Sequence, residues 1–198
     1  MKCTLSAVIL AGGEGRRAGG RPKTDLVVGG EKIISRMLIV IREIFDEVII
    51  VTNSPEKFTE LRDCRIVTDI FEGSGPLGGI HAAMKSSQSK ALFVFAGDMP
   101  FLDKSIINRQ IEEYYSGSFA ALIPVVDTLE EPLHGIYSNS NLDETEKILN
   151  GTAKPAVKEL LANISTGYMK LPSSPEIIKA FININSLSDL VQAENLYL

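Results

Sequence analysis

A glycine-rich segment near the start of the chain also carries a group of cations. Seven of the 16 glycines fall between residues 12 and 30, and four cations lie among them. The glycines are Gly12, Gly13, Gly15, Gly19, Gly20, Gly29 and Gly30, and the cations are Arg16, Arg17, Arg21 and Lys23. Glycine lets backbone N–H groups approach an anion closely, and arginine and lysine add charge-assisted hydrogen bonds. We therefore expect this segment to bind phosphate groups.

Two other kinds of nucleotide-binding loop fit the segment less well. A P-loop needs glycine directly before Lys-Ser or Lys-Thr, whereas Pro22 precedes Lys23 here. A dinucleotide fold matches residues 13–18 through the loose G-x-G-x-x-A pattern, but further glycines and a proline follow where a helix should begin. Its second strand should also end on an acid for the ribose, and it ends at Asn53 instead. A solvated loop whose glycines only turn the chain stays open, and the cations argue against it.

Two aspartates follow predicted strands and could serve a bound phosphate. Asp98 comes directly after the fourth strand, and Asp69 has the equivalent position after the third. Mg²⁺ is held in proteins by one or two carboxylates together with substrate phosphates. The alternative is that each aspartate caps a turn or helix. We expect Asp98 to bind the metal and Asp69 to contact a ligand or orient water.

Three further features could face a ligand. The run from Gly73 to Gly79 precedes a predicted helix, where backbone either passes near a ligand or makes a tight turn. Asn183 and Asn185 alternate with isoleucines on a predicted strand, so both amides should face one side, toward a ligand or toward neighbouring backbone. His81 is expected to be a packed or surface residue rather than a base, and His134 could reach a substrate.

The elements that must position these groups follow from the hydrophobic pattern. Strands are expected at residues 4–10, 48–51, 65–68, 91–95, 119–126, 133–137 and 179–184. Helices are expected at residues 31–45, 55–61, 79–86, 103–115, 141–149 and 154–164, with a closing helix from Ser186 that has Asp189 at capping-box spacing. Strands alternate with helices through the first hundred residues or so, which predicts a three-layer α/β/α fold with a mostly parallel sheet. Ligands bind at the carboxyl ends of such strands.

Composition limits the class of protein. The 198 residues suit a single domain, spanning residues 1–198, and 44% of them are hydrophobic. The net charge of −5 argues against a nucleic-acid binder. No apolar run reaches the roughly 18 to 20 residues of a membrane helix. Two cysteines and two histidines are too few and too scattered for a zinc site. We expect a cytoplasmic protein without a membrane partner.

Four motifs, in order, resemble those of the nucleotidyltransferases that make dinucleotide forms of the molybdenum cofactor. The chain is most similar to the MobA-like guanylyltransferase family, which opens with Leu-Ala-Gly-Gly-x-x-x-Arg-Met-Gly-Gly-x-x-Lys, where residues 10–23 read Leu-Ala-Gly-Gly-Glu-Gly-Arg-Arg-Ala-Gly-Gly-Arg-Pro-Lys. Residues 75–80 are similar to the family's Gly-Pro-Leu-x-Gly segment, and residues 97–100 to its metal aspartate before x-Pro. Residues 181–186 are similar to its late Asn-x-Asn. The opening motif is shared with sugar-nucleotide pyrophosphorylases, and the Gly-Pro-Leu segment narrows the resemblance.

The chain departs from the family pattern at two places. Ala18 stands where the family has methionine, which removes a packing group rather than a chemical one. Lys23 is followed by Thr24-Asp25-Leu26, and Asp25 could temper the charge of the lysine. Both leave the expected catalytic groups in place, and both bear on the choice of nucleotide or acceptor.

The resemblance implies a Rossmann-like fold of the nucleotidyltransferase (nucleotide-diphospho-sugar transferase) type. It implies transfer of GMP from GTP to the phosphate of molybdopterin, with release of pyrophosphate and with Mg²⁺, or Mn²⁺ in its place. CTP as donor, or another acceptor such as adenosylcobinamide phosphate, is the alternative within the enzyme class. A nucleotide-binding partner without turnover is a more distant one, and a dinucleotide oxidoreductase the most distant. Cofactor-biosynthesis or acceptor proteins are the expected partners of a monomer or weak homo-oligomer.

The resemblance also assigns roles to individual residues. The catalytic residues would be Arg17, Lys23 and Asp98, and Asp98 would be the metal ligand. The nucleotide would contact Leu10, Ala11, Gly12, Gly13, Lys23, Asn53, Asp69 and Asp98. The acceptor would contact Gly75, Gly79, Asn183 and Asn185.

Overall fold

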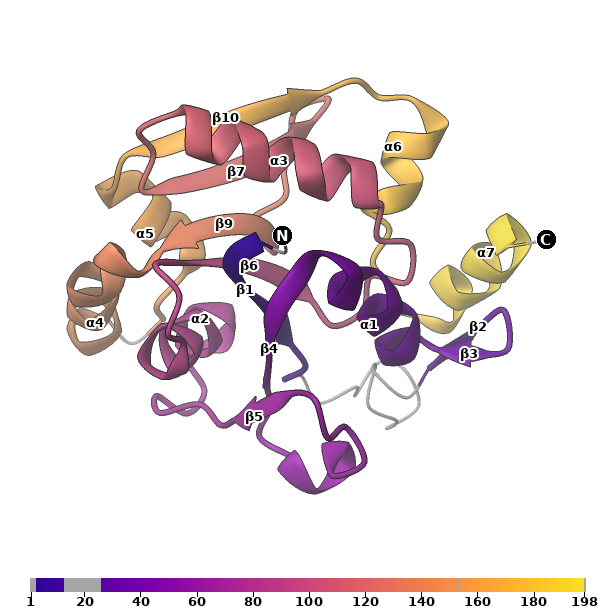
Figure 1. Ribbon diagram of the computed structural model, residues 1–198, viewed down its shortest axis with the longest axis horizontal. Helices are drawn as coiled ribbons and strands as arrows, with labels where there is room; N and C mark the ends of the chain where they lie inside the picture. The colour runs from indigo at the N-terminus through magenta and orange to yellow at the C-terminus, as the bar shows by residue number, and fades with distance from the viewer. Residues whose placement is uncertain (1–2, 13–25, 153, 198) are drawn as a thin grey trace.

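A central mixed β-sheet organises the molecule (Figure 1). The computed structural model describes residues 3–12, 26–152 and 154–197. The strand order is β10-β7-β9-β6-β1-β4-β5, with β8 paired to β7. The strands are β1 (Cys3–Leu10), β4 (Phe45–Val51), β5 (Arg65–Val67), β6 (Ala91–Ala96), β7 (Ala121–Val126), β8 (Leu129–Glu130), β9 (His134–Ser138) and β10 (Thr166–Leu171). A separate hairpin joins β2 (Val27–Val28) to β3 (Glu31–Lys32).

Most strands of the sheet run in one direction. β1 pairs parallel with β4 and β6, β4 with β5, and β10 with β7. β9 is antiparallel to both of its neighbours, β6 and β7. The predicted mostly parallel sheet is therefore confirmed, with one antiparallel strand inserted on the path and β8 antiparallel at the side. Because β1, β4, β5 and β6 share a direction, their carboxyl ends meet at one edge.

Helices cover both faces of the sheet, which confirms the three-layer architecture (Figure 1). One core lies against α1 (Ile33–Ile44) and α3 (Lys104–Ser116) and contains the packed rings of Phe45, Phe93 and Phe95. The opposite core lies against α2 (Gly75–Ser86), α4 (Leu142–Gly151) and α5 (Val157–Asn163). The remaining helices are α6 (Pro175–Ala180), α7 (Leu187–Tyr197) and the 3-10 helices η2 (Pro55–Phe58) and η3 (Asn139–Asn141).

Several predicted helix boundaries have a visible physical cause. The N-cap of α3 is Asp103, whose side chain accepts hydrogen bonds from the backbone N–H groups of Ser105 and Ile106 at 2.8 and 3.0 Å. The closing helix has the predicted capping box, because Asp189 accepts from Ser186 N at 2.8 Å and Ser186 Oγ accepts from Asp189 N at 3.2 Å. α2 begins at Gly75 rather than at the predicted residue 79, since Pro76 is well suited to a first helical turn.

The predicted strand at residues 179–184 is wrong. Helix α6 occupies Pro175–Ala180, with Ser174 as an N-cap whose Oγ accepts from Ile177 N at 3.4 Å, and residues 181–186 are irregular. The strand of this region is β10, which the sequence analysis missed. Its signal is an alternation in which Gly167, Met169 and Leu171 are buried while the residues between them are exposed.

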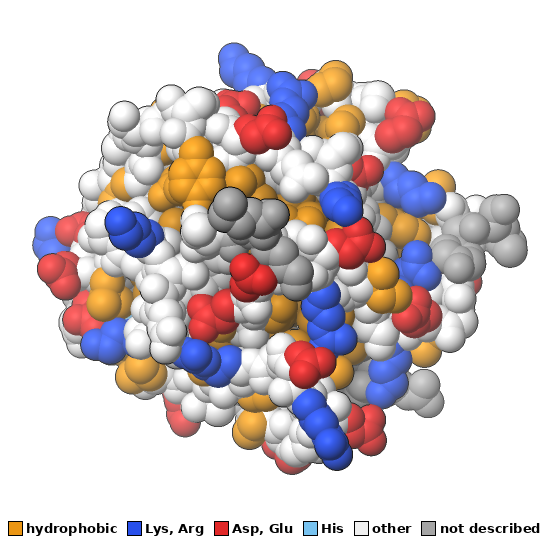
Figure 2. Space-filling model, in the orientation of Figure 1, with side chains coloured by type: hydrophobic (Ala, Val, Ile, Leu, Met, Phe, Trp, Pro, Cys, Tyr) orange, Lys and Arg blue, Asp and Glu red, His pale blue; other side chains and the backbone are white. Residues whose placement is uncertain are grey.

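Charged side chains of both signs are interspersed on the face shown in Figure 2. Hydrophobic side chains reach the surface between them in separate patches. No helix in the described ranges is long and apolar enough to cross a membrane.

Candidate active site

Two strand ends carrying predicted site residues are joined backbone to backbone. Gly97 N donates to Leu10 O at 3.0 Å, which ties the residue before Asp98 to the end of β1. A Cβ atom at Gly97 would lie 2.8 Å from Leu10 O and 3.2 Å from Ala11 Cα, so only glycine allows this approach. Ala11 N in turn donates to Val51 O at 2.8 Å, at the end of β4. The predicted nucleotide-contact residues Leu10 and Ala11 therefore lie beside the predicted metal ligand.

The late asparagine segment meets the same aspartate. Ile184 N donates to Asp98 O at 2.9 Å, and the Asp98 side chain is 8% exposed. Asn183 and Asn185 flank Ile184, so the structure brings both near Asp98, although they do not sit on a strand as predicted. Asn183 is half-buried and its Nδ2 donates to Phe181 O at 3.1 Å, while Asn185 is exposed. Because this segment is not a strand, the prediction that both amides face the same side of a sheet is not supported.

Asp69 and Asn53 form a reciprocal pair at the ends of β5 and β4. Asn53 Nδ2 donates to Asp69 Oδ2, and Asp69 N donates to Asn53 Oδ1, both at 3.2 Å. Asp69 Oδ1 is buried and has no hydrogen-bond partner among the described residues. Burial raises the pKa of the Asp69 carboxyl, against the opposing effect of the Asn53 hydrogen bond. The pair holds one carboxylate oxygen in place and leaves the other without a donor.

The start of α2 packs closely on this pair. A Cβ atom at Gly79 would lie 3.0 Å from Leu10 Cδ2 and 3.7 Å from Asp69 Oδ1. Close packing of the helix on the sheet therefore explains Gly79, as the tight-turn alternative predicted. Gly75 has a φ of +59° with open space where a Cβ would be, so its backbone conformation, rather than crowding, favours glycine there.

The glycine and cation segment lies mostly outside the described residues. Gly13, Arg17 and Lys23 fall in the part that the structure does not describe. Gly12 is exposed, and nothing lies within 4 Å of the position of a Cβ atom there. The predicted roles of these four residues stay predictions.

Asp98 is a metal-ligand candidate with a single carboxylate. Within residues 3–12, 26–152 and 154–197, no group of three or more His, Cys, Asp or Glu side chains is arranged to hold a metal ion. Mg²⁺ keeps most of its ligands from water and substrate phosphates, and one carboxylate is enough to place it. The hard oxygen donor at Asp98 fits that requirement.

The two histidines are structural. His81 is buried, with its Nε2 3.1 Å from Glu146 Oε1 and its ring 5.0 Å from that of Phe71, which confirms the packed position. His134 is fully buried, and burial lowers its pKa to about 4. A neutral imidazole enclosed by aromatic rings cannot act as a solvent-exposed base, so the suggested reach to a substrate is not supported.

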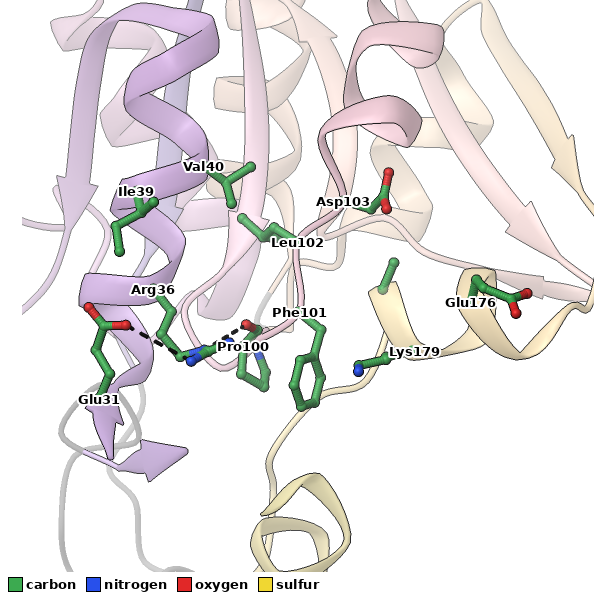
Figure 3. Close-up of a pocket in the computed structure, with 11 residues that line it drawn as sticks. Glu31, Arg36, Ile39, Val40, Pro100, Phe101, Leu102, Asp103, Glu176 and Lys179 are labelled. Atoms are coloured by element: carbon green, nitrogen blue, oxygen red, sulfur yellow. Dashed lines mark hydrogen bonds and ion pairs between the residues drawn. The ribbon is translucent and has the colours of Figure 1, made fainter. Parts of the chain in front are cut away.

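The loop that follows Asp98 is held by contacts with α1 and α6 (Figure 3). A groove of about 440 Å³ lies between α1 and α6, with the loop from Pro100 to Asp103 along its floor. Arg36 Nε donates to Pro100 O at 3.3 Å, and the Lys179 ammonium lies 4.9 Å from the centre of the Phe101 ring. These contacts could not be predicted from the sequence, because α1, the loop and α6 are far apart in the chain.

Comparisons with known proteins point to one family. Residues 7–165 match the family described as "MobA-like NTP transferase domain". A "Probable molybdenum cofactor guanylyltransferase" of Natranaerobius thermophilus is 35% identical over 98% of this chain and 96% of its own. A protein of the same name from Methanosarcina acetivorans is 34% identical over 93% of this chain and 88% of its own.

Solved structures agree with the sequence comparisons. The "Molybdopterin-guanine dinucleotide biosynthesis protein A" of Archaeoglobus fulgidus superposes with a TM-score of 0.83 at 27% identity, covering 98% of both chains. The "CMP:2-keto-3-deoxy-manno-octonic acid synthetase" superposes with a TM-score of 0.76 at 12% identity, covering 98% of both chains. The second likeness concerns the fold alone, and it confirms the nucleotidyltransferase type of α/β fold.

Proposed function

The chain belongs to the MobA-like NTP transferase family, and we propose that it transfers GMP from GTP to the phosphate of molybdopterin. Pyrophosphate is released, and the product is the guanine dinucleotide form of the molybdenum cofactor. The names of relatives 34 and 35% identical over nearly the whole chain support this activity. We place the reaction in the cytoplasm and expect delivery or collection of the cofactor by other biosynthetic proteins.

The observation that carries the proposal is the meeting of three distant segments around Asp98. Leu10 O accepts from Gly97 N, and Asp98 O accepts from Ile184 N. These bonds gather the opening motif, the aspartate motif and the asparagine motif at one edge of the sheet. An enzyme that joins two phosphorylated substrates needs a nucleotide segment and an acceptor segment on either side of one reacting centre.

The reaction joins two anions and needs no covalent enzyme intermediate. A terminal phosphate oxygen of the acceptor attacks the α-phosphorus of GTP in line, the bond from that phosphorus to the bridging oxygen of the β-phosphate breaks, and pyrophosphate leaves. Positioning and charge stabilisation supply most of the acceleration in such transfers. We assign the triphosphate to Arg17, Lys23 and the backbone amides near Gly12 and Gly13.

Asp98 is proposed to be the protein ligand of Mg²⁺. Bound there, the metal would lower the repulsion between the two substrates and stabilise charge on the leaving pyrophosphate. The backbone bonds on both sides of Asp98 keep its side chain at the junction of the nucleotide and acceptor segments.

The nucleoside is proposed to lie over Leu10 and Ala11, with Asp69 reading a donor group of the base. Asp69 Oδ1 is buried without a donor among the described residues. Guanine offers two adjacent donors, the ring N1–H and the 2-amino group, whereas cytosine offers only its 4-amino group along the corresponding edge. A buried acceptor gains most from a ligand that supplies the missing donor.

Product analysis tests the proposed function. Purified protein should convert GTP and molybdopterin to the guanine dinucleotide with one pyrophosphate per product, and chelation of divalent metal should stop the reaction until Mg²⁺ or Mn²⁺ is restored. Parallel reactions with CTP, and with adenosylcobinamide phosphate as acceptor, measure the alternatives. Faster turnover with CTP or with the other acceptor would overturn the assignment, and GTP binding without pyrophosphate release would indicate a partner without turnover.

A further inference from the structure

A short turn between β8 and β9 holds an acid that the proposed reaction does not yet use. The turn spans residues 131–134 and is closed by a hydrogen bond from His134 N to Glu131 O at 3.0 Å. Glu131 N donates to Pro124 O at 3.0 Å, and Leu133 O accepts from Ala96 N at 2.8 Å. The turn is thereby joined to the β7 strand on one side and to the end of β6 on the other.

Buried side chains fix the remaining carbonyls of the turn. Tyr137 Oη donates to Pro132 O at 2.8 Å, and Gln110 Nε2 donates to His134 O at 2.9 Å. Gln110 is fully buried, and its Oε1 lies 3.1 Å from His134 Nδ1. All four carbonyls of residues 131–134 are therefore bonded, which holds the backbone of the turn in place.

The turn contacts the residues that precede the metal-ligand candidate and those that precede the asparagines. Ala96, bonded to Leu133, is two residues before Asp98. The ring of His134 lies 4.8 Å from the ring of Phe181, which is two residues before Asn183. These contacts place the turn on the acceptor side of the site, on the opposite side of Asp98 from Asp69 and β5.

Glu131 is half-buried in this turn, and its carboxylate has no hydrogen bond or ion pair with the described residues. Burial alone raises the pKa of its carboxyl. The adjacent Glu130, by contrast, is exposed. Because an ionised group loses solvation on burial, a half-buried acid without a partner is a candidate for ligand contact when it lies beside a reaction centre.

We propose that Glu131 is a specificity-determining residue for the acceptor, whose carboxylate accepts two hydrogen bonds from a pterin ring. The ring N3–H and the 2-amino group of a pterin are adjacent donors that match the two oxygens of a carboxylate. This inference rests on the proposed function, because it takes the acceptor to be a pterin phosphate. Guanine carries the same donor pair, so the experiment must separate the two substrates.

Steady-state kinetics of Glu131→Gln provides that separation. The amide keeps the size of the side chain but replaces one acceptor oxygen with a donor. We expect the KM for molybdopterin to rise on the order of 10- to 100-fold, the range for losing hydrogen bonds to a charged group, with the KM for GTP within about twofold of wild type. Glu130→Gln removes the same charge one residue away and should leave both values unchanged. An unchanged acceptor KM, or a rise in the GTP KM instead, would overturn the proposal.

Direct binding of free pterins gives a second measurement that does not depend on turnover. Pterin fluorescence can be titrated with protein, alongside lumazine, which carries an oxo group in place of the 2-amino group. Wild type and Glu130→Gln should bind pterin more tightly than lumazine, and Glu131→Gln should lose most of that preference. Equal binding of the two rings by wild type, or the same preference in Glu131→Gln, would contradict the inference. If wild type makes no dinucleotide product, the proposed function fails while this comparison still tests Glu131.

Discussion

The two sides of the sheet edge build their parts of the site in different ways. On the β4–β5 side, Asn53 and Asp69 come directly after parallel strands and pair with each other. On the β6–β9 side, the positions depend on hydrogen bonds between distant segments, as from Ile184 N to Asp98 O and from Ala96 N to Leu133 O. The first side is specified by local strand endings, and the second by tertiary contacts. Substitutions on the first side should therefore change ligand contacts, while those on the second should also change geometry.

Removing the Asp98 carboxylate should have the largest effect, because that residue joins the two sides. We expect Asp98→Ala and Asp98→Asn to lower kcat at least about 100-fold, as loss of charge stabilisation in the transition state predicts. Lys23→Ala should cost a similar factor. Asp143→Asn, an exposed acid on α4, is the matched control and should retain wild-type turnover. Near-normal rates in either Asp98 variant would show that Asp98 is not the reaction centre shared by the two sides.

Gly97→Ala should change the geometry of the site without removing any of its chemical groups. The added methyl would lie 2.8 Å from Leu10 O, which must move and so loosen the junction of β1 and β6. Forcing an atom into a packed site typically costs about 1 to 3 kcal/mol of unfolding free energy, and we expect a lower melting temperature together with reduced kcat. At Gly12 an added Cβ meets nothing within 4 Å, so Gly12→Ala should leave the melting temperature unchanged. Equal melting temperatures for the two variants would show that the close approach is not needed for stability.

Asp69→Asn should weaken binding of the nucleotide and leave binding of the acceptor unchanged. Loss of a charged acceptor is expected to raise the KM for GTP about tenfold and to leave the acceptor KM unchanged. Because burial raises the pKa of Asp69, wild type should lose GTP affinity on acidification at a higher pH than an ordinary aspartate would allow. The Asn variant should lack that pH dependence. An acceptor KM that rises with the substitution would show that the two sides are not separate.

The smallest expected effect is on the stability of Glu131→Gln. The folded pKa of Glu131 is raised by burial, so the ionised carboxyl destabilises the folded state at neutral pH. The destabilisation disappears as the pH falls through the raised pKa toward the unfolded value. The Gln variant should therefore be more stable than wild type at pH 7, by no more than about 0.5 kcal/mol, with the difference vanishing under acidic conditions. A clear loss of stability at pH 7 in thermal unfolding would indicate a hidden structural partner instead.

Local strand endings could be predicted from the sequence, whereas long-range contacts could not. The strand endings at Leu10, Val51 and Ala96 follow from buried apolar runs. Asp98 after β6 and Asp69 after β5 were found because the place of each residue in the chain, just beyond a strand, fixes its place in the fold. The apolar residues between 179 and 184 resemble a strand, but Ser174 and Pro175 start a helix that runs to Ala180 instead. The alternation at residues 166–171 is a local sign of a strand, but the pairing of β10 with residues 121–126 is a long-range contact that this pattern does not specify.

The features that the sequence did not reveal, such as the turn at Glu131 and the burial of His134, also depend on contacts between distant segments. Nothing near Glu131 in the chain reveals that Tyr137 and Gln110 fix the turn, or that Ala96 ties it to the end of β6. Likewise, the burial of His134 depends on Phe93, Phe95 and Phe181, which come from three separate segments. Resemblance to a family pointed to Asn183 and Asn185 as site residues, although the local pattern predicted the wrong secondary structure for them.

The hydrogen bond from Ile184 N to Asp98 O has a consequence for the order of folding. Contacts between residues far apart in the chain form late, because closing a long loop costs entropy before the contact is gained. During synthesis, β1, β4 and β6 are available to pair well before residue 184 leaves the ribosome. A nascent chain can therefore pair the strands of its nucleotide side while its acceptor side is still incomplete, and we expect catalytic competence only once residue 184 has reached Asp98.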